Sequence, residues 1–465
     1  MTQNPMLSPL LAEILSAFGD GGAPAEPGLA LLSETGDADL PSWFAVTDLA
    51  AASIGAAGLM AAKLMQCRTG ALPHVTVDRR LASFWFAWSL RPEGWQVPPP
   101  WDPIAGDYRA KDGWIRLHTN APHHRAAAQS ILGAHADREA MQRAVERWDG
   151  DALESAVVEA GGCAAVMHSF QEWEAGPQGA AVAREPLVIW REHGRRDPPW
   201  LQAKDGQPLA GIRVLDLTRV LAGPVAGRFL AAYGADVLRI DPPDWDEPGV
   251  VPEVALGKRC AGLNLKDRED RAVFERLLAG ADILLHGYRA GALAGLGFDG
   301  EGLRAINPRL IDVGLDAYGW SGPWSMRRGF DSLVQMSAGI AEYGMRLSGA
   351  QRPVPLPVQA LDHATGYLMA ASVCHALRRF LQSGDVMSAR LSLARTARLL
   401  AGTRRTELGG GMMAESGEDL DPAVEKTAWG SARRIRFPLR LDGVPAAWRI
   451  PAGPLRAAPA EWEAG

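Results

Sequence analysis

Short apolar runs alternate with helix-length segments from Gly211 onward. Runs such as IRVLDLT, DVLRID and LIDVGLD are of strand length, and segments such as EDRAVFERLLAG between them carry apolar residues at helical spacing. Strands that alternate with helices are typical of a parallel sheet with right-handed crossovers. We therefore expect an α/β fold, with a parallel Rossmann-like sheet domain at residues 211–403.

Two helices in the pattern have almost no charged face. The segment 357–377, PVQALDHATGYLMAASVCHAL, places Asp362 at the start of a helix that is apolar on all sides, and such helices are normally buried. A shift of 314 residues places the Ala-rich helix at 40–66 on this segment, with Asp48 on Asp362. The shared order of Asp, helix, Gly turn and strand indicates an internal repeat. We expect the copy of the helix to pack in the core.

Charged, Pro-rich and Gly-rich segments divide the rest of the chain. Residues 1–36 are expected to form an N-terminal arm with a short helix. Residues 37–191 hold the helix copy and a region with a strand hairpin that turns at Lys111–Gly113. The segment 192–210 is the predicted linker, and 404–465 is the predicted C-terminal tail, with one short strand.

Composition and charge exclude several classes of protein. The net charge is −6 and no basic stripe is present, which argues against a nucleic-acid partner. The four cysteines show neither a CxxC nor a Cys/His spacing, so we expect reduced thiols, no metal site and a cytoplasmic location. The N-terminus lacks the basic segment of a secretory signal, and the apolar run Leu49–Ala62 is too short to span a bilayer. No membrane partner is therefore expected.

Asp362 admits two interpretations from the residues alone. It can be an N-cap, because Asp accepts hydrogen bonds from the first free amides of a helix. It can also be a reactive carboxylate, because a dry apolar helix strips such a group of its hydration and the helix N-terminus stabilises charge. Both interpretations stay open at this point.

Five segments between Gly211 and about Leu400 carry a resemblance to a known family. They are VLDLTRVLAGPVAGRFLAAYGADVLRID, GKRCAGLNLK, ADILLHGYRAGALAGLG, INPRLIDVGLDAYGWSGPW followed by RRGFDSLVQMSAG, and the Asp362 helix. In this order and spacing they resemble the family III CoA-transferases of the CaiB/BaiF type, which include formyl-CoA transferase, carnitine CoA-transferase and α-methylacyl-CoA racemase. The resemblance implies a smaller α+β domain, whose signatures YRAKDGWIRL and FQEWEAGPQGAAVA here precede the sheet domain. The domain order is therefore rearranged or duplicated.

The resemblance implies an activity and a site. Asp362 would be the catalytic nucleophile, forming an aspartyl mixed anhydride with an acyl-CoA and then an aspartyl-CoA thioester, from which a carboxylic acid takes the CoA. Coenzyme A would be a substrate and not a permanently bound cofactor, and the partners would be a small-molecule acyl-CoA and a carboxylic acid. The assembly would be a homodimer. Residues 95–190, from the same chain or from a partner, would cover the Asp362 pocket. The implied CoA contacts are Val220, Leu221, Ala222, Lys258, Arg259, His286, Gly287, Tyr288, Arg289, Arg328, Gly329 and Phe330, with Asp331 beside them.

Three basic residues suit the phosphates of CoA. Lys258 and Arg259 are expected to be exposed, although a solvated turn is equally compatible with them. The planar guanidinium of Arg289 matches the geometry of a pyrophosphate, with a surface arginine that caps a helix as the alternative.

Three other activities are weighed against transfer. Racemases of this family carry His where Phe330 stands, which favours transfer over racemisation or isomerisation. Asp241 at the end of the second strand suggests an NAD-dependent dehydrogenase, but LAGPVAG lacks the GxGxxG spacing. The altered segments leave a catalytically silent acyl-CoA-binding homologue open. Asp48 is expected to be a structural relic or a cap, and ELGGGMM (407–413) a tail and not a shielding loop.

Overall fold

A seven-stranded sheet forms the centre of the computed structural model, which describes residues 9–19, 31–198, 206–289, 291–411 and 413–463. The strand order is β10-β9-β8-β11-β12-β13-β7. All neighbours in this sheet are parallel except β7, which runs antiparallel to β13 at one edge. In sheet order the bounds are Lys258–Gly262, Asp236–Asp241, Arg213–Leu217, Ile283–His286, Ile311–Asp316, Asp385–Ser392 and Ile189–Arg195. The expected α/β fold with a parallel sheet is confirmed.

The order in which strands are added reverses between β8 and β11. From β8 the chain adds β9 and β10 on one side, and it then crosses over to add β11, β12 and β13 on the other. The loops that leave β8 and β11 therefore diverge, and ligands of open α/β sheets bind in the crevice at the carboxyl ends of such strands. The fold places a site beside the residues that follow Leu217 and His286.

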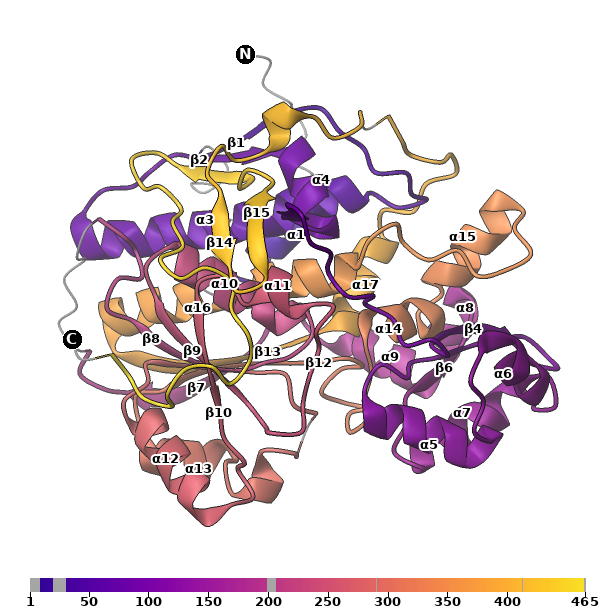
Figure 1. Cartoon of the computed structure of the whole chain (residues 1–465). Coiled ribbons are helices and arrows are strands. Elements are labelled where there is room, and N and C mark those ends of the chain that lie inside the picture. The colour runs from indigo at the N-terminus through magenta and orange to yellow at the C-terminus, as the bar shows by residue number, and fades with distance from the viewer. Residues whose placement is uncertain (1–8, 20–30, 199–205, 290, 412, 464–465) are drawn as a thin grey trace.

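Helices cover both faces of this sheet (Figure 1). On one face lie α12 (Arg268–Ala279) and α13 (Gly300–Ile306), whose apolar residues share a core with β8, β9 and β11. On the other face lie α10 (Ala222–Ala232) and α16 (Ala360–Ser383), and α3 (Val46–Thr69) packs on α16 as a further layer. Helices α10 and α16 approach closely because Gly366 has no side chain: a Cβ there would lie 2.3 Å from the carbonyl oxygen of Ala222.

The boundaries of the helices confirm the internal repeat. Helices α3 and α16 begin and end 314 residues apart, and so do the next helices, α4 (Arg79–Ala87) and α17 (Leu393–Ala401). Both long helices stop at a glycine in the left-handed region, Gly70 with φ 80° and Gly384 with φ 75°. Glycine is the residue that adopts this conformation at no steric cost, so the same stop signal is used twice.

A three-stranded sheet extends the repeat. Strand β2 (Val75–Asp78) lies between parallel β1 (Leu32–Thr35) and antiparallel β16 (Leu439–Leu441), as β13 lies between parallel β12 and antiparallel β7. Helix α3 is enclosed by this small sheet and α16, which explains why all its faces are apolar. By length and composition α3 could cross a membrane, but 89% of its most apolar window is buried within the structure. The prediction that this helix packs in the core is confirmed.

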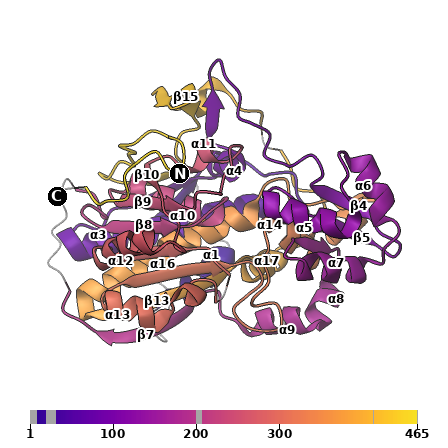
Figure 2. The same ribbon diagram turned by 60° about the horizontal axis from the view of Figure 1, so that its bottom comes forward.

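The smaller domain lies beyond one end of the sheet (Figure 2). Its antiparallel strands β4 (Gly106–Arg109), β5 (Trp114–Leu117) and β6 (Ala164–Val166) share a core with α5 (Pro122–Leu132), α6 (Arg138–Val145) and α7 (Gly150–Glu159). The predicted hairpin turn is present, closed by a 2.9 Å bond from Ala110 N–H to the carbonyl of Gly113. Other α-helices of the described residues are α8 (Phe170–Ala175), α9 (Pro177–Arg184), α11 (Val251–Val254), α14 (Asp331–Ser337) and α15 (Ile340–Ser348).

Two predicted boundaries within the chain are wrong. Residues 192–195 of the expected linker 192–210 belong to β7, because this segment provides the backbone partners for the edge of β13. Residues 199–205 of that linker lie outside the described residues. The unit predicted at 37–191 is also divided, because α3 packs with the sheet domain and not with the smaller domain.

Both ends of the chain are more structured than predicted. Strands β14 (Glu425–Thr427) and β15 (Gly430–Arg434) form a sheet with β3 (Leu90–Pro92), so most of the expected tail 404–465 is part of the fold. Arg434 anchors it through a buried pair with Glu253 at 3.3 Å. The short helix expected in the N-terminal arm is α1 (Pro9–Ser16), which packs on α3, whereas residues 1–8 and 20–30 lie outside the described residues.

Candidate functional site

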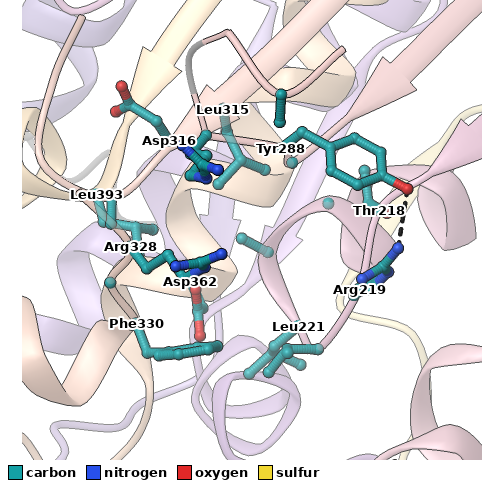
Figure 3. A pocket seen from close by; sticks show the side chains of 18 of the residues that line it. Thr218, Arg219, Leu221, Tyr288, Leu315, Asp316, Arg328, Phe330, Asp362 and Leu393 are labelled. Atoms are coloured by element: carbon teal, nitrogen blue, oxygen red, sulfur yellow. Dashed lines mark hydrogen bonds between the residues drawn. The ribbon is translucent and has the colours of Figure 1, made fainter. Parts of the chain in front are cut away.

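A cavity of about 330 Å³ opens at the crevice between β8 and β11 (Figure 3). Segments that follow the parallel strands form most of its walls. Helix α16 and the smaller domain complete them. These segments are 217–223 after β8, 287–289 after β11, 315–317 at the end of β12, 327–330, Asp362, and His123 and His124 of α5. The prediction that residues 95–190 cover the Asp362 pocket is confirmed, and here the cover comes from the same chain.

The turn after β8 is held in a strained conformation. Val220 has φ 62°, in the left-handed region that β-branched residues avoid. Such a residue costs on the order of 1–3 kcal/mol and persists where the surroundings fix it. Here the Val220 N–H donates to Glu247 Oε2 at 2.8 Å, and Glu247 is itself paired with buried Arg239. The turn directs the backbone of Val220, Leu221 and Ala222 into the cavity.

An arginine stands between two aromatic rings at the cavity wall. The guanidinium of Arg219 lies 4.8 Å from the ring centre of Trp245 and 5.1 Å from that of Tyr288. Its Nη2 donates to the Tyr288 hydroxyl at 2.8 Å, as Figure 3 shows. A cation fixed in this way is suited to an anionic ligand. Sequence reasoning did not select Arg219, although it lies inside the VLDLTRVLAGP segment.

Asp362 is not the N-cap of its helix. The cap position of α16 is Gln359, whose side chain makes no capping bond. The amides of Leu361 and Asp362 donate instead to Asp331 Oδ2, at 2.9 and 3.0 Å. Within the described residues no hydrogen-bond donor reaches the Asp362 carboxylate, although the residue is only 6% exposed. The interpretation of Asp362 as a cap is therefore wrong, and Asp331 takes that role.

The two carboxyl groups form an electrostatically coupled pair. Burial raises the pKa of Asp362 well above its ordinary value, and the charge of Asp331 raises it further. Burial also raises the pKa of Asp331, to about 6, against the opposing effect of hydrogen bonds from Gln335 and from the amides of residues 361 and 362. Asp331 is therefore the carboxyl group that ionises first, and Asp362 is a dry group that is poorly solvated once it is charged.

Sequence reasoning missed three further titratable residues that line the cavity, His123, His124 and Asp316. His124 is 3% exposed, and neither of its ring nitrogens has a hydrogen-bond partner among the described residues. Burial, with the charges of His123 and Arg328, lowers its pKa to about 3. Burial raises the pKa of Asp316 to about 8, against a 2.8 Å bond from the N–H of Gly319. The adjacent histidines at the start of a helix were a signal in the sequence, but their position depends on how the smaller domain packs.

Three of the predicted CoA contacts lie elsewhere. Lys258 is not exposed but buried, with Nζ 2.8 Å from Asp216 Oδ2, because it begins β10 and lies away from the carboxyl ends of the parallel strands. Arg259 is mostly buried and pairs with Asp236 at 2.8 Å. His286 ends β11 with Nε2 3.1 Å from Asp312 Oδ1 and does not line the cavity. The other predicted contacts line it: Val220, Leu221, Ala222, Gly287, Tyr288, Arg289, Arg328, Gly329 and Phe330.

Comparison with known proteins relates this site to one family. Residues 209–428 match the sequence model of CoA-transferase family III. An acyl-CoA transferase of Gibberella moniliformis is 30% identical over 289 residues, which are 57% of this chain and 50% of that protein. The succinate–glutarate CoA-transferase of Agrobacterium fabrum is 33% identical over 197 residues, which are 38% and 49% of the two chains. This chain thus spans about half the length of each of these relatives.

A solved structure gives a further, partial similarity. A CaiB/BaiF family protein from Brucella suis superposes with a TM-score of 0.37 and 26% identity, over 48% of this chain and 65% of that one. The match to the family model covers the parallel strands of the sheet, the strained turn and Asp362. Over residues 209–428, the chain is thus similar to the proteins of CoA-transferase family III.

Proposed function

We propose that this protein transfers CoA between an acyl-CoA thioester and a carboxylic acid, with Asp362 as the covalent nucleophile. One observation carries the proposal: a buried carboxyl group without a hydrogen-bond donor faces the crevice at the switch point of the sheet. A carboxylate is a weak nucleophile in water because hydration stabilises it. Removal of that hydration makes its attack on a thioester easier.

Asp331 supports this role through the helix that carries Asp362. Asp331 accepts the hydrogen bonds of the first amides of α16. Those amides therefore do not bind the Asp362 carboxylate, and they do not lower its basicity. The Asp331 bond to Gln335, whose Oε1 accepts from the N–H of Leu356 at 2.7 Å, fixes the start of the helix. Asp362 is thus positioned by backbone contacts while its side chain stays available.

The proposed reaction proceeds by two pairs of acyl substitutions. An Asp362 oxygen attacks the thioester carbonyl and the C–S bond breaks. CoA departs as its thiolate, and a mixed anhydride forms between Asp362 and the acyl group. The thiolate then attacks the aspartyl carbonyl, which expels the first acid as its carboxylate and forms an aspartyl-CoA thioester. An incoming carboxylate attacks that thioester and releases the thiolate, which takes the new acyl group and regenerates Asp362. No external oxidant, reductant or net proton is required.

The cations around the cavity support CoA as the ligand. Arg289 and Arg328 are exposed and line the cavity, and Arg219 is held at the wall beside Tyr288. CoA carries several phosphate charges, which guanidinium groups bind with bidentate geometry. The start of α10, with Leu221 at its N-cap, adds helix N-terminal amides suited to an anion.

The histidines in and beside the Asp362 cavity favour transfer over racemisation. Racemisation needs a base that removes a proton from the carbon next to the thioester. Phe330 stacks on His118 at 3.8 Å, and burial with the charges of His124 and Arg116 lowers the pKa of His118 to about 3. His124 has a similarly low pKa. Imidazoles of such low basicity are poor proton acceptors.

The experiment that tests the proposal is to trap the aspartyl thioester. The protein is mixed with an acyl-CoA and hydroxylamine, and peptide mass spectrometry locates the hydroxamate. We expect the label on Asp362, and we expect Asp362→Ala to bind CoA while losing both label and transfer.

Asp48→Ala is the matched control, because Asp48 occupies the equivalent position of the repeat. It should retain label and transfer. Transfer that survives in Asp362→Ala would refute the assignment, and CoA binding without label in the wild-type protein would indicate a silent acyl-CoA-binding homologue.

A further inference from the structure

A second cavity of about 410 Å³ lies behind the start of α16. Asp331 lines it with its helix α14, while the same residue caps the amide of Asp362. Val220 and Leu221 line both this cavity, which we name the rear chamber, and the cavity that holds Asp362. A molecule in the rear chamber is therefore separated from the proposed nucleophile by one turn of backbone.

Most of the rear chamber is apolar. Two indole rings, a proline-rich segment and aliphatic side chains form its walls. They include Trp88, Trp101, Pro353, Pro355, Pro357 and Val250. A volume of this size falls in the range of small-molecule sites, which are lined mainly by apolar side chains.

The charged groups of the rear chamber are already paired. Among the described residues that line it, the one cationic side chain is Arg116, whose Nη1 donates to Asp107 Oδ1 at 2.6 Å. The Asp331 carboxylate is occupied by two amides and Gln335. Arg116 Nε has no hydrogen-bond partner among the described residues, but Asp107 already balances the charge of Arg116. A second carboxylate placed here would therefore add to the negative charge of Asp107 and Asp331, and burying that charge is costly.

Uncharged polar atoms remain available at the wall. His118 is 5% exposed and lines the rear chamber. Within the part of the chain that the structure describes, neither His118 Nδ1 nor the buried Ser332 hydroxyl has a hydrogen-bond partner. The ring of His118 lies flat on Phe330, which lines the Asp362 cavity, so the stacked pair forms part of the wall between the two spaces.

We infer that the rear chamber holds the hydrocarbon part of the acid that is exchanged, and that the substrate class is an apolar monocarboxylic acid. The reacting carboxyl group points past Val220 and Leu221 toward Asp362, and the aliphatic or aromatic body lies between the indoles and the prolines. Dicarboxylic acids are disfavoured, because their distal charge would be buried beside Asp107. This inference rests on the proposed transfer activity and specifies its substrate.

The test compares acids that differ only at their distal end. With acetyl-CoA as donor, kcat/KM is measured for butanoate, hexanoate and octanoate, and for the dicarboxylates adipate and suberate. We expect kcat/KM to rise by roughly threefold to fourfold per methylene until the chamber is full. Hexanoate should exceed adipate by about a hundredfold or more.

Two variants connect this preference to the rear chamber. Ala87 is exposed at the end of α4 and lines the chamber, so Ala87→Trp should fill space without disturbing the core and should remove the gain from butanoate to octanoate. Ala292 lines the Asp362 cavity, so Ala292→Trp should raise the KM for acetyl-CoA and leave the preference among acids as it was. Calorimetric titration with octanoate and suberate gives the same comparison without turnover.

The outcomes separate this inference from the proposed function. Absence of the Asp362 adduct with every donor would refute the transferase proposal, while the calorimetric titrations would still decide whether the chamber prefers octanoate. Adduct formation with equal use of hexanoate and adipate would overturn the inference alone. A preference for long acids that Ala87→Trp leaves intact would place the hydrocarbon elsewhere and would overturn it too.

Discussion

The substitution Asp316→Asn should make the protein's stability less dependent on pH. Asp316 is 5% exposed at the end of β12, where Oδ1 accepts from Gly319 N–H at 2.8 Å and Oδ2 has no partner among the described residues. Burial, with the nearby charge of Glu185, raises its pKa from 3.8 to about 8 against the effect of the Gly319 bond. Asn keeps the Oδ1 acceptor and cannot ionise.

The expected magnitude follows from the difference between the folded and unfolded pKa values. Below pH 4 both states bind the proton, so burial of Asp316 costs little. As pH rises from 4 toward 8, the unfolded state releases the proton while the folded state keeps it, and wild-type stability falls by about 1.4 kcal/mol per pH unit. The loss is complete above about pH 8, where both states are ionised.

The assay is urea unfolding of the wild type and the variant at pH 4.5, 6.0 and 7.5. The free-energy difference in favour of Asp316→Asn should grow by about 4 kcal/mol across this range. The change with pH is the test, because any fixed cost of burying the new amide group is independent of pH. A difference that stays constant from pH 4.5 to 7.5 would refute the argument.

Asp312→Asn serves as the control, because the pKa of Asp312 is lowered in the folded protein whereas that of Asp316 is raised. Burial would raise the pKa of Asp312, but the Arg390 charge and the His286 hydrogen bond bring it below its ordinary value. A depressed pKa stabilises the fold above the unfolded pKa, and that stabilisation is lost only as pH falls below it. Asp312→Asn should therefore be less stable than wild type by a constant amount between pH 4.5 and 7.5.

Three other predictions concern the site. Arg289→Ala should weaken CoA binding by about 1.5–3 kcal/mol in calorimetry and hardly affect pantetheine, whereas Arg259→Ala should leave CoA binding unchanged; equal loss for both ligands would assign Arg289 to the fold. In D₂O, a 2-methylacyl-CoA should gain no deuterium next to the thioester, and rapid exchange detected by mass spectrometry would instead support racemisation. Asp331→Asn should lower transfer while the enzyme still binds CoA, since the amide group caps α16 less well; unchanged turnover would show that the cap is dispensable.

Local pattern was sufficient to predict the centre of the fold. Each parallel strand is a short apolar run between helices, so the α/β sheet follows from residue order alone. The repeat was also visible, because Asp and Gly recur at fixed offsets at the two ends of α3 and α16. Residues 192–195 of strand β7 were assigned to a linker because that part of the strand, EHGR, is polar. An edge strand with one partner needs little apolar surface, and a polar edge strand therefore resembles a loop in sequence.

The site depended more on tertiary contacts than the fold did. Lys258 was expected at the surface because GKR is polar, yet its charge is neutralised by Asp216, 42 residues earlier in the chain. Asp362 and Asp331 could not be assigned as nucleophile and cap from the sequence, since either carboxylate can cap a helix. In the structure the Leu361 and Asp362 amides donate to Asp331, which identifies Asp331 as the capping carboxylate. The position of His124 depends on the packing of a separate domain.

The repeat itself shows what distinguishes a candidate nucleophile from its copy. Asp48 and Asp362 occupy the same place in helices whose N-caps have nearly equal backbone angles. Arg79 Nη2 lies 2.6 Å from Asp48 Oδ1, Arg405 lies 3.4 Å from Oδ2, and the side chain is 23% exposed. A carboxylate held by two guanidinium groups and reached by water is stabilised as an anion, and its nucleophilicity is low. Asp362 is buried, and none of the described residues donates to its carboxylate in this way. The copy instead contributes α3, which covers α16 and keeps the helix behind Asp362 dry. The N-terminal copy of the repeat therefore supports the site by packing and not by chemistry.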